Sequence, residues 1–194
     1  MAGMVQKTDE ELVLAVLGGD EDSFRDLVVR YQSRVVNYLQ RMLRDVEEAH
    51  ELGQEVFLRV YRALDRFDHS YRFSTWLFRV AQNAAIDRIR KRRLKMVSIN
   101  RPETGDSEGG EWEFESSEPT PYQSVRNRER AGAILEAIHG LRDEYRELIE
   151  LRHFAELSYE EIAELKGMPL GTVKNKLFRG RQMLKGVLAD FLSD

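Results

Sequence analysis

The stretch Ser158–Lys185 reads SYEEIAELKGMPLGTVKNKLFRGRQMLK and predicts a helix, a tight turn and a second, basic helix. Ser158 and Glu161 form an S-x-x-E capping box, so the first helix is expected to begin there. Gly167 ends that helix, because glycine takes left-handed backbone angles at little cost. Pro169 then prevents the same helix from continuing. This segment therefore predicts a helix-turn-helix unit.

The second helix of this unit has one apolar face and one basic face. Val173, Leu177 and Leu184 recur at helical spacing and are expected to point inward. The basic residues are Lys174, Lys176, Arg179, Arg181 and Lys185, and no acidic residue lies between Leu165 and Ala189. A short cationic helix at a steep angle to its neighbour suits the major groove of DNA. The alternative is an ordinary helical hairpin with a solvated basic face.

Helical periodicity extends through nearly everything before Lys95, and no segment sustains the alternation of a strand. Thr8 and Glu11 form another capping box, and Gly18-Gly19 ends the helix that follows. Further helices are predicted from about Asp22 to Leu43, from near Asp45 and from near Ser74, and helicity resumes near Val125. We therefore expect an all-α fold with two small helical domains, at residues 1–95 and 126–194.

The segment between these domains, residues 96–125, has the composition of a flexible acidic linker. It holds three of the four prolines, and the stretch Pro102–Pro121 contains seven acidic residues and no basic one. Residues 84–101, which overlap the start of this linker, carry seven basic residues and one acid. The charge is therefore unevenly distributed, although the net charge of the whole chain is only −4. Such a linker cannot bury enough apolar surface to order itself alone. Trp112 and Phe114 within it either touch a neighbouring domain loosely or anchor a partner.

Composition excludes several classes of protein. The chain has no cysteine, which excludes disulfide scaffolds and cysteine-ligated zinc. No apolar run approaches the roughly 20 residues that a membrane span requires. The first residues lack the basic and apolar regions of a secretory signal. We therefore expect a cytoplasmic protein that does not insert into membranes.

Nothing in the sequence calls for catalysis. The four histidines are scattered, and there is neither a Ser-His-Asp order nor a glycine-rich phosphate loop. Glu51 and Glu55 lie one helical turn apart, and paired carboxylates can hold a divalent metal. No third ligand stands at suitable spacing, so these residues and Gln54 fit better as a surface for a partner's helix. We therefore predict no catalytic residue, no metal site and no cofactor.

An aromatic cluster precedes the basic run at residues 84–101. The segment YRFSTWLFRVAQN contains Tyr71, Phe73, Trp76 and Phe78 and ends at Asn83. Aromatic rings beside a cationic track can stack on unpaired bases, and the Asn83 amide can form two hydrogen bonds with a base edge. The alternative is that these rings belong to the core. Because four rings cannot share one face of a helix, we expect a split, with Leu77 and Phe78 inside.

The order of these motifs resembles bacterial RNA polymerase sigma factors, specifically the small extracytoplasmic-function (ECF) group. The resemblance rests on LGQEVFLRVYRAL, FSTWLFRVAQN, the acidic linker, LSYEEIA and PLGTVKNKLFRGR, and it covers about residues 9–190. It implies a promoter-specificity subunit that is not itself an enzyme. Its implied partners are the RNA polymerase core, promoter DNA and an anti-sigma factor.

The resemblance also implies roles for particular residues. The residues implied in binding the polymerase core are Glu51, Gln54, Glu55 and Phe57. Those implied in recognising and melting the −10 element are Phe73, Trp76, Asn83, Asp87 and Arg88, together with the loop at about residues 68–74. Those implied in reading the −35 element are Lys174, Asn175, Lys176, Phe178, Arg179 and Arg181. The acidic linker is implied to thread the positively lined channels of the polymerase.

The chain departs from the family pattern at three places. Glu51 stands where aspartate is common, Asp68-His69-Ser70 follows Phe67 where Arg-Gly is common, and Lys174 replaces a common arginine. Lysine lacks the bidentate fork that arginine offers to guanine, so base preferences do not transfer directly. Three other interpretations stay open: a stand-alone dimeric transcriptional regulator, a helical adaptor that does not bind DNA, and a magnesium-dependent nuclease.

Overall fold

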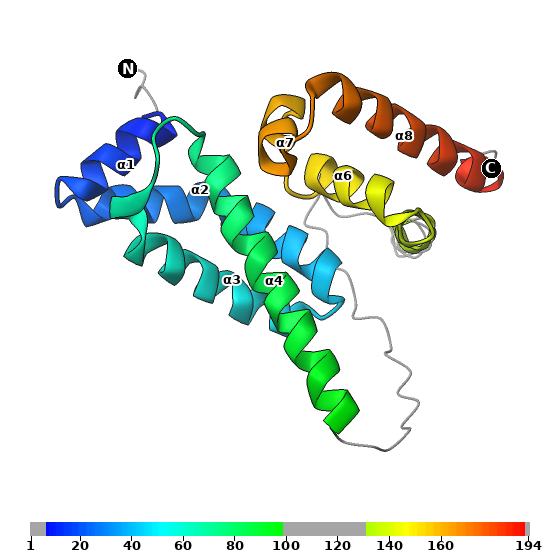
Figure 1. Cartoon of the computed structure of the whole chain (residues 1–194), viewed down its shortest axis with the longest axis horizontal. Helices are drawn as coiled ribbons and strands as arrows, with labels where there is room; N and C mark the ends of the chain where they lie inside the picture. The colour runs from blue at the N-terminus through cyan, green and yellow to red at the C-terminus, as the bar shows by residue number, and fades with distance from the viewer. Residues whose placement is uncertain (1–6, 99–130, 193–194) are drawn as a thin grey trace, which may run out of the picture.

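The computed structural model describes residues 7–98 and 131–192, and every regular element in these ranges is helical (Figure 1). The first range contains α1 (Asp9–Leu17), α2 (Glu21–Leu43), α3 (Val46–Arg62), the 3-10 turn η1 (Leu64–Arg66) and α4 (Phe73–Ser98). The second contains a helix at residues 131–139, α6 (Asp143–His153), α7 (Tyr159–Lys166) and α8 (Leu170–Leu192). The predicted all-α fold is confirmed.

Local signals in the sequence set several of the helix boundaries. Both predicted capping boxes are present: Thr8 and Glu11 exchange two hydrogen bonds, as do Ser158 and Glu161. Gly167 ends α7 with φ of 60°, in the left-handed region that favours glycine. α4 continues to Ser98, which is beyond the predicted domain end at Lys95. Trp112, Phe114 and most of the predicted linker lie outside the described residues.

The first four helices pack around one apolar core. α2 contributes Leu27, Val35 and Leu39, α3 contributes Leu52, Val56 and Val60, and α4 contributes Leu77, Phe78 and Ala81, all of them buried. The predicted inward positions of Leu77 and Phe78 are therefore confirmed. α2 and α3 approach closely at Gly53, where an added Cβ would lie 3.1 Å from a Val36 methyl group.

The second group of helices is built on the helix-turn-helix. Val173 and Leu177 of α8 are buried with Ile162 of α7 and Leu148 of α6. An added Cβ at Gly180 would lie 3.3 Å from Ile149, so α8 crosses α6 at short range. α8 has 23 residues, and its regular structure extends well past the basic segment that ends at Lys185.

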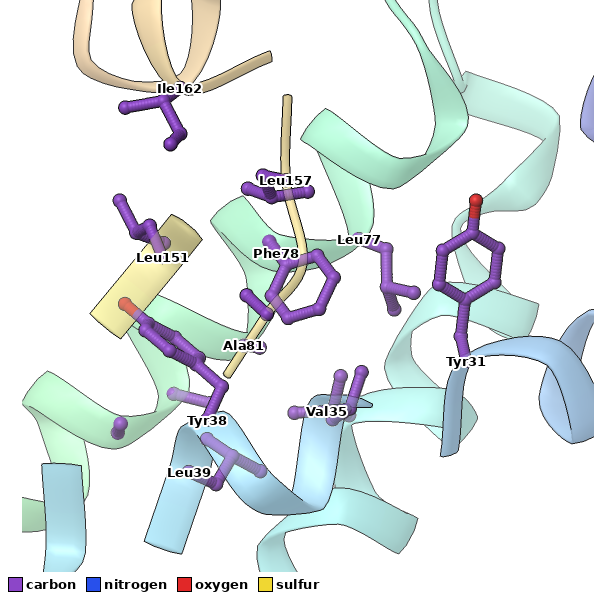
Figure 2. Close-up of a cluster of buried hydrophobic side chains, with 14 of the residues drawn as sticks. Tyr31, Val35, Tyr38, Leu39, Leu77, Phe78, Ala81, Leu151, Leu157 and Ile162 are labelled. Carbon is purple, nitrogen blue, oxygen red and sulfur yellow. The ribbon is translucent and has the colours of Figure 1, made fainter. Parts of the chain in front are cut away.

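The two groups also pack against each other. α7 contacts α4 and α6 contacts α2, which places the second group beside the first (Figure 1). Figure 2 shows Tyr38 of α2 and Phe78 of α4 gathered with Leu151, Leu157 and Ile162. All five side chains are buried, at 1% exposure or less. The sequence predicted two modules joined by a linker and did not indicate this shared core.

Candidate nucleic-acid interface

α8, the second helix of the helix-turn-helix unit, packs through its apolar face, and this fixes which side chains project. Val173 and Leu177 are fully covered, whereas Lys174, Asn175 and Arg179 between and after them are exposed. Phe178 is 60% exposed although it is a large apolar residue. The four exposed side chains lie in the second and third turns of α8, in its N-terminal half, which is the part that enters the major groove in helix-turn-helix proteins.

Two further basic residues predicted for this surface have partners inside the domain. The Lys176 amine donates a hydrogen bond of 2.8 Å to a carboxylate oxygen of Glu144. This hydrogen bond holds the pKa of Glu144 below its ordinary value. The Arg181 guanidinium lies 5.9 Å from the centre of the Tyr159 ring. Both cations are therefore oriented by neighbours, and Lys176 is partly neutralised.

The residues predicted to act at the −10 element are divided between the surface and the core. Asn83 is exposed on α4, and Asp87 pairs with Arg90 at 2.8 Å. Phe73 is only 1% exposed, and its ring packs against Tyr31 and Phe67. In this structure Phe73 is therefore a core residue. Trp76 is partly buried, with its ring centre 5.1 Å from that of Phe67.

A small cavity of about 120 Å³ lies where the loop after η1 meets the start of α4. It is lined by Arg66, Phe67, Asp68, Tyr71, Thr75, Trp76 and Arg79. The Arg79 guanidinium stands 5.5 Å from the centre of the Tyr71 ring. Hydrogen bonding from the Ser70 backbone N–H holds the pKa of Asp68 below its ordinary value. Aromatic rings and two arginines in one hollow suit an unstacked base and its phosphate.

Arg88 connects α4 to α3 through a cluster of carboxylates. Its guanidinium lies 2.9 Å from Glu55, 3.4 Å from Glu48 and 4.0 Å from Glu51. Arg88 was predicted for DNA, and Glu51 and Glu55 for the polymerase, yet the structure places the three in one ion-pair cluster. These carboxylates face a fixed cation, and no metal-binding group of three or more His, Cys, Asp or Glu occurs among the described residues.

Gln54 and Phe57 lie on the neighbouring face of α3, in a groove between α2 and α3. The groove has a volume of about 730 Å³. Its lining also includes Phe24 and Val28 of α2 and Leu58 and Tyr61 of α3. The rings of Phe24 and Tyr61 meet edge to face with their centres 4.8 Å apart. The four residues predicted to bind polymerase therefore lie on two adjacent faces of α3.

Sequence reasoning missed the apolar lining of this groove. Leu58 is 55% exposed and Tyr61 is 43% exposed, and they follow Gln54 at helical spacing. The sequence did contain a signal for a second apolar surface: α3 carries apolar residues, such as Leu58 and Tyr61, outside the single stripe that faces the core. Phe24 and Val28 on α2 could be joined to this face only once the helix pairing was known.

Comparison with known proteins places both halves of the chain in one family. Residues 27–95 match the family described as Sigma-70 region 2, and residues 131–184 match Sigma-70, region 4. The chain is 38% identical over 174 residues to the ECF RNA polymerase sigma factor SigW of Bacillus subtilis, with 89% of this chain and 92% of SigW covered.

Further relatives agree with this match. The chain is 35% identical over 185 residues to the ECF RNA polymerase sigma-E factor of Escherichia coli K12, which covers 92% of this chain and 93% of that protein. Among solved structures, the sigma factor RpoE in complex with the anti-sigma factor NepR from Bartonella quintana aligns with a TM-score of 0.62 at 22% identity, over 86% of this chain and 96% of that one. At this identity the structural match concerns the fold.

Proposed function

This chain belongs to the ECF sigma factors, which direct RNA polymerase to promoters. From that membership we propose which of its surfaces binds the −35 element, which binds the −10 element and which binds the polymerase core. As a sigma factor it is not an enzyme, because the polymerase carries out the chemistry. Family membership also decides against the stand-alone regulator, the helical adaptor and the nuclease.

The −35 element is read by the N-terminal half of α8. The observation that carries this proposal is the burial of Val173 and Leu177 against α6 and α7, which directs Lys174, Asn175, Phe178 and Arg179 outward. Arg179 offers the bidentate donor pair that fits guanine, Asn175 fits adenine, and Lys174 acts as a point charge. Lys176 and Arg181 lie nearer the phosphates.

The test is Arg179→Ala in transcription with core polymerase. If Arg179 reads a base, the variant loses about 1–3 kcal/mol of promoter binding and becomes tolerant of changes at one upstream position. Arg181→Ala serves as the control, because loss of a phosphate contact would weaken binding to all sequences equally and reduce its salt dependence. An Arg179 variant with unchanged affinity and unchanged sequence preference would remove this residue from the reading surface.

The −10 element is recognised and opened by the exposed face of α4 and the cavity before it. Asn83 is accessible for a base edge, and Trp76 and Tyr71 offer rings beside Arg79 and Arg66. Flipping a base costs a few kcal/mol, which stacking on these rings can return. We assign Phe73 the structural task of supporting the cavity, because its ring is buried beneath it.

The polymerase core is bound through the groove between α2 and α3. The exposed Leu58 and Tyr61 and the partly buried Phe24 around a polar Gln54 suit an inserted helix from a partner. Glu51 and Glu55 contribute from the neighbouring face, where Arg88 holds them in place. Arg88 therefore acts as a brace between the polymerase-binding helix and the DNA-binding helix.

Regulation and location follow from the relatives. A solved relative is complexed with an anti-sigma factor, and we propose that such a protein also holds this chain inactive. Bacterial RNA polymerase works on chromosomal DNA, so we place the chain in the cytoplasm. No helix in the described ranges is long and apolar enough to cross a bilayer.

A further inference from the structure

A glutamate from α6 stands at the edge of the DNA-reading face of α8. Glu144 lies in the first turn of α6, and α6 packs side by side with α8 (Figure 1). Gly180 of α8 permits this approach, because an added Cβ there would lie 3.5 Å from the Cβ of Tyr145. The basic segment between Leu165 and Ala189 has no acid of its own, so the carboxylate of Glu144 reaches it from another helix.

Lys176 lies on the flank of α8 that faces Glu144. It precedes Gly180 by one helical turn and Arg179 by three residues, so it stands between the face packed on α6 and the exposed reading face. Its amine donates a hydrogen bond of 2.8 Å to one carboxylate oxygen of Glu144. The other oxygen lies 3.4 Å from the Arg142 guanidinium. Both oxygens of Glu144 therefore have a cationic partner, and Lys176 is held against α6.

The carboxylate of Glu144 carries its charge at neutral pH. The hydrogen bond from Lys176 lowers the pKa of Glu144, and the positive charges of Lys176, Arg142 and Arg179 lower it further. The side chain of Lys176 is 25% exposed and that of Glu144 is 42% exposed, so DNA at the reading face can reach both. Lys176 therefore adds little net positive charge to this face while it is paired with Glu144.

The two flanks of α8 offer different surfaces to DNA. A helix in the major groove has a sugar–phosphate backbone on each side. On the flank beside α7, Arg181 stands near the Tyr159 ring and its guanidinium is exposed. On the flank beside α6, a phosphate meets the negative charge of Glu144 and must compete with it for Lys176.

We propose that Glu144 limits the affinity of the free chain for DNA of any sequence, because it holds Lys176 back from the phosphates. This inference rests on the proposed function of α8. Phosphate contacts supply nearly all non-specific binding, for which the whole chromosome competes, whereas base contacts select the promoter. A chain with one phosphate contact withheld stays available to the polymerase, and the base contacts of Asn175 and Arg179 decide where it binds.

The test is Glu144→Gln in the full chain, which keeps the shape of the side chain and removes its charge. Binding to a fluorescent duplex of random sequence is measured by anisotropy from 50 to 200 mM salt. One added phosphate contact should raise affinity about eightfold at 0.1 M salt and steepen the slope of log K against log salt by about 0.9. Glu10→Gln is the matched control, because Glu10 is exposed in the first turn of α1 and should leave the slope unchanged.

A double-mutant cycle tests whether Lys176 is the group that Glu144→Gln releases. In a chain that already carries Lys176→Gln, the gain from Glu144→Gln should fall to about twofold, because only the charge of Glu144 is removed and salt screens it. An equal gain with and without Lys176 would overturn the proposal. A Glu144→Gln chain that binds random duplex no more tightly than the wild type would overturn it as well.

Failure of this inference can be distinguished from failure of the proposed function. If Glu144→Gln gives no gain while Arg179→Ala alters promoter choice with core polymerase, only the role of Glu144 is wrong. If Arg179→Ala leaves promoter affinity and promoter choice unchanged, the proposed reading surface is wrong, and the inference that rests on it falls too.

Discussion

A buried carboxylate at the domain interface gives the chain a stability that depends on pH. Glu150 on α6 is 6% exposed, and burial raises its pKa to about 7 from an ordinary 4.5. Arg146 of α6, Arg41 of α2 and Arg44 at the C-terminal cap of α2 favour its charged form, and Glu147 opposes it, but burial has the largest effect. A pKa raised by folding means that the folded chain holds this proton more tightly than the unfolded chain. The stabilisation is therefore complete below pH 4.5 and is lost as pH rises through about 7.

The perturbation that exposes this effect is Glu150→Gln, which keeps the shape and removes the titration. The gap between 4.5 and about 7 corresponds to about 3 kcal/mol in total. Between pH 5.5 and 8 the wild-type chain should lose about 2 kcal/mol of this contribution, and the variant none. The free energy of unfolding of the variant minus that of the wild type should therefore increase by about 2 kcal/mol from pH 5.5 to pH 8.

Urea denaturation at pH 5.5, 6.5, 7.25 and 8 provides the assay, with the free energy of unfolding compared between the two proteins. Glu10→Gln is the control, because Glu10 is exposed in the first turn of α1. Its difference from the wild type should stay constant with pH. A constant difference for Glu150→Gln as well, or a variant that is less stable than wild type at pH 8, would refute the burial argument.

Three other outcomes are expected. Gly180→Leu should lower the free energy of unfolding, measured by thermal denaturation, by about 1–3 kcal/mol, because α6 leaves no room for a side chain there. Gly186→Leu is the control: this position faces open space, so the substitution should change the free energy of unfolding little. Gln54→Ala should weaken binding to core polymerase and leave duplex DNA binding by the free chain unchanged, as measured by fluorescence anisotropy. Asn83→Ala should reduce promoter melting, measured by permanganate reactivity, and leave the affinity for core polymerase unchanged. If either variant lost promoter melting and polymerase affinity equally, its assignment would be wrong.

Local chemistry explains why much of the fold could be predicted from the sequence. The capping box at Ser158 and Glu161 and the left-handed Gly167 involve only neighbours in the chain, and both appear as expected. The inward positions of Leu77 and Phe78 follow from the period of the helix. Such features depend little on which element lies opposite.

Residues that depend on the neighbouring helix were harder to place. Glu51 and Gln54 are three positions apart on α3, but one meets Arg88 of α4 and the other lines the groove beside α2. Phe73 could stack on a base or enter the core, and only the position of Tyr31 and Phe67 decides this. The sequence does not encode helix pairing in a local signal, so these assignments required the structure.

The domain interface was beyond sequence reasoning for a related reason. Tyr38 and Phe78 have the spacing of ordinary core residues, and nothing distinguishes a side chain buried by its own domain from one buried by another. The acceptor for Arg34 is the backbone carbonyl of Ala155, 121 positions away. A backbone acceptor leaves no trace in residue identity.

The most direct test of this account is a map of transcription start sites made with core polymerase from the encoding organism, with and without the purified chain. We expect new starts that share two upstream sequence blocks at a constant spacing of about 25 base pairs, or roughly 85 Å of duplex. Arg179→Ala should alter preference only in the upstream block. Identical start sites with and without the chain would contradict its role in choosing promoters.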